Sequence, residues 1–199
     1  MFDWVLSVIE AWGYPGIFFL MLAENVFPPI PSEVIMPLAG YLAGNGTLSL
    51  VPTVLAGTTG SVVGALLWFW LGRAVGAARL KRWAGRHGRW MTVSPSDIDQ
   101  AQDWFDRRGG AAVFIGRMIP AIRTLISVPA GIACMPPIRF LVYTVAGSFL
   151  WTLLLAAAGL LLEAQYARVA DVIDPVSKLV VAAVVGFYLY RVITWKGAE

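Results

Sequence analysis

Four charged side chains stand inside two apolar stretches of the sequence that prolines interrupt. They are two acids within residues 13–44 and two arginines within residues 110–135: Glu24, Glu33, Arg117 and Arg123. A guanidinium binds phosphate through paired N–H donors, whereas a carboxylate in a low-dielectric site can take up and release a proton. The residue types therefore predict a phosphate-binding site at Arg117 and Arg123, and proton coupling at Glu24 and Glu33.

The composition indicates that these charges lie in a membrane. Hydrophobic residues make up 58% of the 199 residues and charged residues 14%, whereas a soluble domain carries about a quarter charged residues. The mean hydropathy of +0.71 agrees. One cysteine and one histidine are too few for a Cys- or His-based metal centre. With no nucleophile–base arrangement or nucleotide-binding loop, the sequence predicts no catalytic residue, metal or cofactor.

Three stretches are apolar and long enough to cross a bilayer as single helices, which takes about 20 residues. They are residues 52–72, 138–162 and 176–193. The two charged stretches are different, because proline removes amide donors and stops a helix. We expect their turns at these hairpin tips: Pro28, Pro29, Pro31 and Ser32 in the first stretch, and Pro120 in the second.

Broken backbone at membrane depth is tolerated only where protein or a wet cavity surrounds it. We therefore expect residues 13–44 and 110–135 to form re-entrant helical hairpins, with the second returning helix starting near Ala121. Residues 4–22 leave a second possibility open, a full span.

The two halves of the sequence repeat one order of elements. A short amphipathic pattern precedes each hairpin, in residues 2–11 and in residues 96–108, where Gly109-Gly110 predicts the helix end. A span follows each hairpin. The sequence thus predicts a single all-α membrane domain, residues 1–199, built from two inverted repeats with an added C-terminal span. The repeats and their connection are residues 1–73, a loop with the amphipathic helix in residues 74–109, and residues 96–162.

The basic residues predict the orientation of this domain. Many of the 15 lie within residues 73–108, which places that segment and the C-terminus in the cytoplasm under the positive-inside rule. A single span between the hairpins makes them open to opposite sides, as in transporters whose broken helices meet at the midplane. The basic run is short and flanked by apolar spans, so it does not predict nucleic-acid binding.

The charged motifs resemble those of one known family. The segments are ENVFPPIPSE at residues 24–33, FIGRMIPAIR at residues 114–123 and PAG at residues 129–131. They are similar to the DedA family of bacterial membrane proteins, also called the SNARE-associated or VTT-domain family, over roughly residues 13–162. Some members carry an aspartate after a glycine where this chain has Ser32-Glu33.

The resemblance implies transport or scrambling of lipids in the bacterial cytoplasmic membrane. In bacterial members it implies recycling of undecaprenyl phosphate or flipping of phospholipids, with dependence on the proton gradient. Glu24 and Glu33 would then be the coupling acids, and Arg117 and Arg123 the arginines needed for activity.

We therefore expect a proton-coupled transporter of undecaprenyl phosphate or another anionic phospholipid. The alternatives are a phospholipid scramblase, a small-anion carrier and a non-transport membrane scaffold in which the four charges only clamp the fold. An enzyme is the least expected class. The expected partner is membrane lipid, and the sequence leaves the oligomeric state open, a homo-oligomer included.

Overall fold

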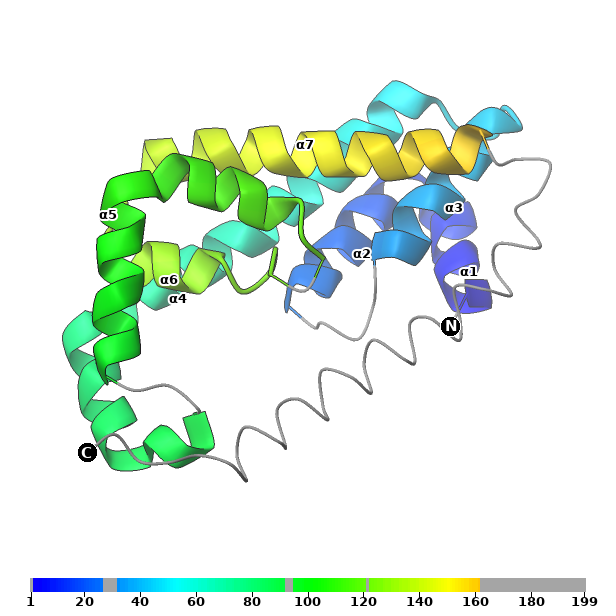
Figure 1. The fold of residues 1–199 in the computed structure, drawn as a ribbon. Coiled ribbons are helices and arrows are strands. Elements are labelled where there is room, and N and C mark those ends of the chain that lie inside the picture. The colour runs from blue at the N-terminus through cyan, green and yellow to red at the C-terminus, as the bar shows by residue number, and fades with distance from the viewer. Residues whose placement is uncertain (1, 27–31, 92–94, 121, 162–199) are drawn as a thin grey trace.

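The computed structural model describes residues 2–26, 32–91, 95–120 and 122–161 (Figure 1). This part of the chain contains helices and no strand, as predicted. The helices are α1 (Phe2–Trp12), α2 (Tyr14–Val26), α3 (Ser32–Gly44), α4 (Leu50–Met91), α5 (Pro95–Arg117), α6 (Ser127–Ile132) and α7 (Pro137–Leu161).

Gly13 separates the first two helices. Its φ of +60° is in the left-handed region, which glycine adopts without steric cost. Its amide donates a hydrogen bond of 2.7 Å to the carbonyl of Ile9, as at a helix C-terminus. Residues 4–22 are therefore two helices and not one continuous span. The buried side chains of α1, Val5 and Ile9, lie on the face predicted to be apolar.

The helices α4 and α7 supply two membrane-length apolar segments. Within the described ranges, Leu50–Arg79 and Pro137–Leu161 are long and apolar enough to cross a bilayer, close to the predicted residues 52–72 and 138–162. Large apolar side chains on both helices are exposed, among them Leu67 at 55% and Ile138 at 78%. Surfaces of this kind mark contact with lipid or a partner. The predicted span 176–193 lies outside the described residues.

Two helices are longer than predicted. The helix α4 continues to Met91, so residues 74–91 are helical and not a loop. That segment has no proline and is rich in alanine and arginine, which favour helix.

The helix α5 passes through Gly109-Gly110, so the predicted helix end there is wrong. A Cβ on Gly110 would overlap the Tyr143 ring of α7, which indicates that this glycine permits close helix packing. The ribbon of α5 bends before it runs along α7 (Figure 1), and a glycine pair allows such a bend.

The helix α3 packs closely on α7 through glycines on both sides. A Cβ on Gly40 would overlap the carbonyl oxygen of Ala156, and a Cβ on Gly159 would overlap the carbonyl oxygen of Pro37. The backbones of the two helices are therefore in direct contact, and a larger residue at either glycine would push them apart.

The helix α6 packs on α4 through the same kind of contact. A Cβ on Gly131 would overlap the carbonyl oxygen of Phe69, and a Cβ on Gly72 would overlap that of Val128. The short helix α3 thus lies against α7, and the short helix α6 lies against α4. The helix α2 also lies against α4, and the end of α5 lies against α7. The C-terminal end of α2 and the segment after α5 approach each other beneath the middle of α7 (Figure 1).

Candidate functional site

Glu24, Glu33 and Arg123 meet where the two halves of the chain approach. Nη2 of Arg123 donates a hydrogen bond to Oε1 of Glu24, and Oε1 of Glu33 lies 3.9 Å from the same nitrogen. Glu24 stands in the last turn of α2 and Glu33 is the second residue of α3. The two acids of the first charged stretch therefore face one arginine of the second.

Burial makes this cluster electrostatically costly unless its charges cancel. Glu24 is 3% exposed and Arg123 is 6% exposed, whereas the side chain of Glu33 is 33% exposed. An ion in a low-dielectric interior loses several kcal/mol of hydration free energy, and the Glu24–Arg123 ion pair offsets part of that loss. Oε2 of Glu24 and Oε1 of Glu33 have no hydrogen-bond partner in the described structure.

Arg117 lies apart from this cluster. It ends α5, is 2% exposed, and donates a hydrogen bond of 2.7 Å from Nη2 to Oγ of Ser127. Its Nε has no hydrogen-bond partner, and none of the acids in the described ranges lies within ion-pair distance of it. Within the described residues, an acid therefore offsets the charge of Arg123, and none does so for Arg117.

The turns around the charges differ in part from the prediction. The second returning helix begins at Ser127 and not near Ala121, which is outside the described residues. The segment after Pro120 forms turns, with the amide of Arg123 donating to the carbonyl of Ile119 at 3.0 Å. Proline lacks an amide and disfavours helix before it, which agrees with the end of α5 at Arg117. Arg123 lies in the turns that follow and not in a first helical turn. Pro120 itself is exposed.

The predicted tip of the first stretch is described only at its end. Ser32 begins α3, as predicted, and is fully buried. Pro28, Pro29 and Pro31 lie outside the described residues.

Arg117 and Asn25 occupy matching places in the two halves. A Cβ on Gly147 of α7 would lie 2.7 Å from Cβ of Arg117, and a Cβ on Gly64 of α4 would lie 2.5 Å from Cβ of Asn25. Each side chain thus stands at the same kind of close helix crossing. The first half fills that place with a neutral amide side chain and the second half with a charged one.

Trp151 of α7 contacts both halves of the site. The guanidinium carbon of Arg123 lies 5.8 Å from the centre of the Trp151 ring, and the indole N–H donates a hydrogen bond of 3.5 Å to Oγ of Ser32. The motifs in the sequence did not single out Trp151. Its position in the chain is unusual, because tryptophans gather near the ends of membrane spans and Trp151 stands in the middle of one.

Hydroxyl contacts between α4 and α7 were also missed. The Oγ1 atoms of Thr58 and Thr152 are 2.9 Å apart, and Ser61 donates to Ser148 at 3.4 Å. Nδ2 of Asn25 donates to Oγ of Ser61 at 3.3 Å. These buried polar contacts join the two long helices beside the charged cluster, as hydroxyls commonly do between membrane helices.

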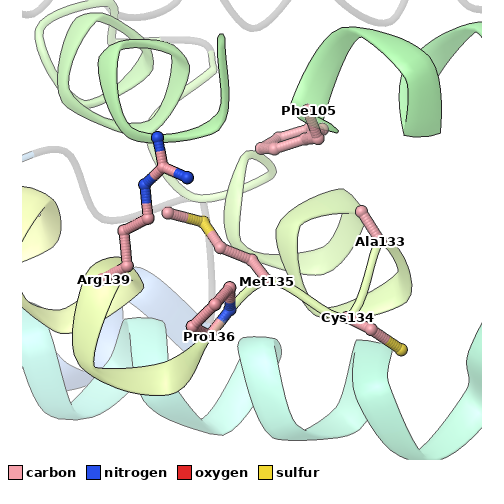
Figure 2. A pocket seen from close by; sticks show the side chains of 6 residues that line it. All are labelled: Phe105, Ala133, Cys134, Met135, Pro136 and Arg139. Atoms are coloured by element: carbon pink, nitrogen blue, oxygen red, sulfur yellow. The ribbon is translucent and has the colours of Figure 1, made fainter. Parts of the chain in front are cut away.

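A small cavity lies at the junction of α6 and α7, away from the four charges (Figure 2). Its volume is about 80 Å³, and its lining residues are Phe105, Ala133, Cys134, Met135, Pro136 and Arg139. Drug-sized ligands occupy about 300–1,000 Å³, so this cavity is too small for one. Within the described ranges, no three His, Cys, Asp or Glu side chains gather in a way that could hold a metal.

The chain matches a family model over most of the site's helices. The model, described as the VTT domain, matches residues 30–161. An undecaprenyl phosphate transporter A of Staphylococcus aureus is 32% identical over 193 residues, which cover 97% of this chain and 95% of the relative. The transporter of the same name from Bacillus subtilis is 32% identical over 95% of this chain and 92% of its own length.

A relative with a different name is also similar. An alkaline phosphatase-like protein of Lactococcus lactis subsp. cremoris is 41% identical over 89% of this chain and 84% of its own length. No solved structure matches this chain.

Proposed function

Because the chain belongs to the VTT-domain family, also called the DedA family, we propose that it carries a lipid phosphate across the bacterial cytoplasmic membrane. Undecaprenyl phosphate is the proposed substrate. Two relatives that cover nearly the whole chain bear the name undecaprenyl phosphate transporter A. Another anionic phospholipid with the same phosphate chemistry is the next candidate.

The observation that carries this proposal is the buried, unneutralised guanidinium of Arg117. Removing a charge from water without a counter-ion costs several kcal/mol, and an incoming phosphate would recover that free energy through paired N–H donors. Nε of Arg117, which has no partner in the described structure, is one such donor. In the proposed carrier, the phosphate binds Arg117 and Arg123 while the lipid tail stays in the bilayer.

In the proposed carrier, proton coupling arises because the carboxylates and the lipid phosphate compete for Arg123. Glu24 and Glu33 approach the same nitrogen that a phosphate would use. Protonation of Glu24 would release this guanidinium to the substrate, and loss of the proton would return it to the carboxylate. Proton and phosphate binding would thereby favour each other. The proton gradient would drive the cycle, and the proposal involves no cofactor.

We also propose that the chain is built from inverted repeats with two re-entrant hairpins, α2–α3 and α5–α6. The reciprocal glycine contacts of α3 with α7 and of α6 with α4 support this arrangement. With residues 73–108 cytoplasmic, as the basic residues favour, the two hairpins would open to opposite sides. The cluster of Glu24, Glu33 and Arg123 would then lie near the midplane, within reach of either side.

Liposomes that contain the purified protein test this function. Labelled undecaprenyl phosphate is placed in one leaflet, and its arrival in the other is followed with and without an imposed proton gradient. We expect transfer that the gradient accelerates, that Arg117→Met abolishes and that Glu24→Gln uncouples from the gradient.

Other results of this liposome assay would indicate other functions. Uptake of inorganic phosphate without lipid movement would indicate a small-anion carrier. Equal movement of zwitterionic lipid without a gradient would indicate a scramblase, and release of inorganic phosphate from the lipid would indicate a hydrolase, as the name of the Lactococcus relative suggests. Absence of any movement, with Glu24→Gln affecting only stability, would indicate a scaffold.

A further inference from the structure

Resting on the proposed function, we infer that Trp151 is a positioning residue for Arg123. The face of its ring holds the cation, so that N–H donors of the guanidinium can pass from carboxylate to lipid phosphate. The family match and the names of the relatives assign no role to this tryptophan.

The geometry separates two kinds of contact with Arg123. The carboxylates of Glu24 and Glu33 both approach Nη2, and the N–H donors of a guanidinium lie in its plane. The guanidinium carbon instead lies over the face of the Trp151 ring, 5.8 Å from the ring centre. A cation–π contact is an attraction between the ring and the charge of the whole group, and it needs no carboxylate or phosphate acceptor. It therefore persists while the in-plane partner changes from carboxylate to phosphate.

The backbone around Arg123 explains why such a contact is needed. Arg123 lies in the turns before α6, whereas Trp151 stands in the middle of the 25-residue helix α7. A long side chain on a turn would lose its position when Glu24 becomes protonated. The ring offers a fixed place for the cation, and a desolvated site strengthens that attraction.

The indole N–H ties the ring to the acidic half of the site. It donates to Oγ of Ser32, the residue before Glu33 at the start of α3. This hydrogen bond joins the edge of the Trp151 ring to α3, while the face of the ring contacts Arg123 from the second half of the chain. An aliphatic residue of similar size at position 151 would fill the space and provide neither contact.

A matched tryptophan provides the control. Trp68 of α4 also donates its indole N–H to the first half, at 2.6 Å to the carbonyl oxygen of Asn25. Its ring makes no cation–π contact with Arg123 in the described structure. Replacing Trp68 therefore removes an indole and its hydrogen bond but leaves the guanidinium in place.

The first measurement is lipid transfer by Trp151→Leu, Trp151→Phe, Trp68→Leu and the wild type in liposomes. We expect Trp151→Leu to raise KM by about tenfold, the effect of losing one desolvated cation–π contact. Phenylalanine restores an aromatic face, so Trp151→Phe should raise KM by only about threefold. Trp68→Leu should leave KM within about twofold of the wild type, since the π contact is intact. An equal rise in Trp68→Leu, or no rescue by phenylalanine, would overturn the assignment.

The second measurement does not depend on transport. Thermal unfolding in detergent is compared for the wild type, Trp151→Leu, Arg123→Leu and the double variant. If the ring holds the guanidinium, Trp151→Leu lowers the Tm clearly less in the Arg123→Leu background than in the wild type. Additive Tm shifts would refute the contact even if the protein carries no lipid. Wild-type protein that moves no lipid, together with non-additive shifts, would instead refute the proposed function and leave the positioning role supported.

Discussion

The two buried arginines of this chain have opposite electrostatic surroundings. Arg123 faces Glu24 and Glu33 and lies against the Trp151 ring. Arg117 is more deeply buried, yet its recorded side-chain partner is the neutral hydroxyl of Ser127. The two arginines are six positions apart in the sequence, and within the described residues an acid pairs with one of them and not with the other.

The difference suggests separate roles for the two residues. A buried ion pair stabilises only relative to its broken forms, and an apolar replacement of the pair is often neutral or better. Arg123 can therefore exchange between binding a carboxylate and binding another anion. In the described structure no acid pairs with Arg117, so an anion that reaches Arg117 displaces no carboxylate from it. Four sets of variants test this difference between the two arginines.

The largest effect is expected from Arg123→Leu. This change leaves the Glu24 carboxylate buried without a counter-ion, and the free energy of unfolding should fall by about 3–5 kcal/mol. Unfolding of the purified protein in detergent measures the loss. The double variant Glu24→Gln/Arg123→Leu should recover most of the stability without recovering transport. A single variant as stable as the wild type would mean that the ion pair does not neutralise Glu24.

Arg117→Met should act in the opposite direction on stability. Methionine keeps an unbranched side chain at this place and removes a buried charge that has no ion-pair partner in the described structure. The free energy of unfolding should stay unchanged or rise by up to about 4 kcal/mol, while transport of lipid phosphate is lost. Arg117→Lys is the control, because it keeps the charge but not the paired donors. A destabilisation as large as that of Arg123→Leu would erase the difference between the two arginines.

Gly40→Ala and Gly131→Ala test whether the two halves share their packing while they differ in charge. Each added Cβ would meet a backbone carbonyl of the facing helix, which cannot rotate away. Both variants should lose about 1–3 kcal/mol of unfolding free energy, the usual cost of overpacking. Gly109→Ala is the matched control, since the nearest atoms to its Cβ, in Met135, are 4.0 Å away. A loss at only one of the two sites would argue against equivalent helix crossings.

The smallest effect is expected at an ion pair outside the buried site. Lys81 and Asp99 join α4 to α5, and their side chains are 34% and 61% exposed. Exposed pairs contribute about 0–1 kcal/mol, so Lys81→Ala should change the unfolding free energy within that range. A double-mutant cycle with Asp99→Ala measures the coupling. A coupling comparable to that of Glu24 with Arg123 would show that burial does not set the strength of these pairs.

The sequence was sufficient for the all-helical class and for the position of several helices. Prolines and apolar runs predicted α2, α3 and α7, and opposite charges in two broken stretches left open whether the acids and the arginines meet, as Arg123 does with Glu24. Helix ends were harder to place. Gly109-Gly110 has the composition of a helix end, but tertiary packing against Tyr143 keeps α5 continuous, and this contact is not visible in the local sequence.

The pairing of individual charges also exceeded what the sequence could predict. Counting two acids against two arginines suggests complete cancellation, whereas the arrangement depends on where each turn places its side chain. Arg123 lies in turns that Pro120 initiates, while Arg117 remains on α5 beside Ser127. The sequence marks Trp151 only as a tryptophan in the middle of an apolar span, and its two contacts depend on where α3 and the Arg123 turn lie.

The contact of α3 with α7 has a consequence for biosynthesis. The ribosome makes the first half of a chain before the second, and Gly40 packs on Ala156, which is synthesised much later. The α2–α3 segment, with its acids, therefore enters the membrane before the surface that covers it exists. During that interval Glu24 has neither Arg123 nor α7 beside it. The nascent chain must keep this carboxylate protonated or in contact with the insertion machinery until α7 has left the ribosome.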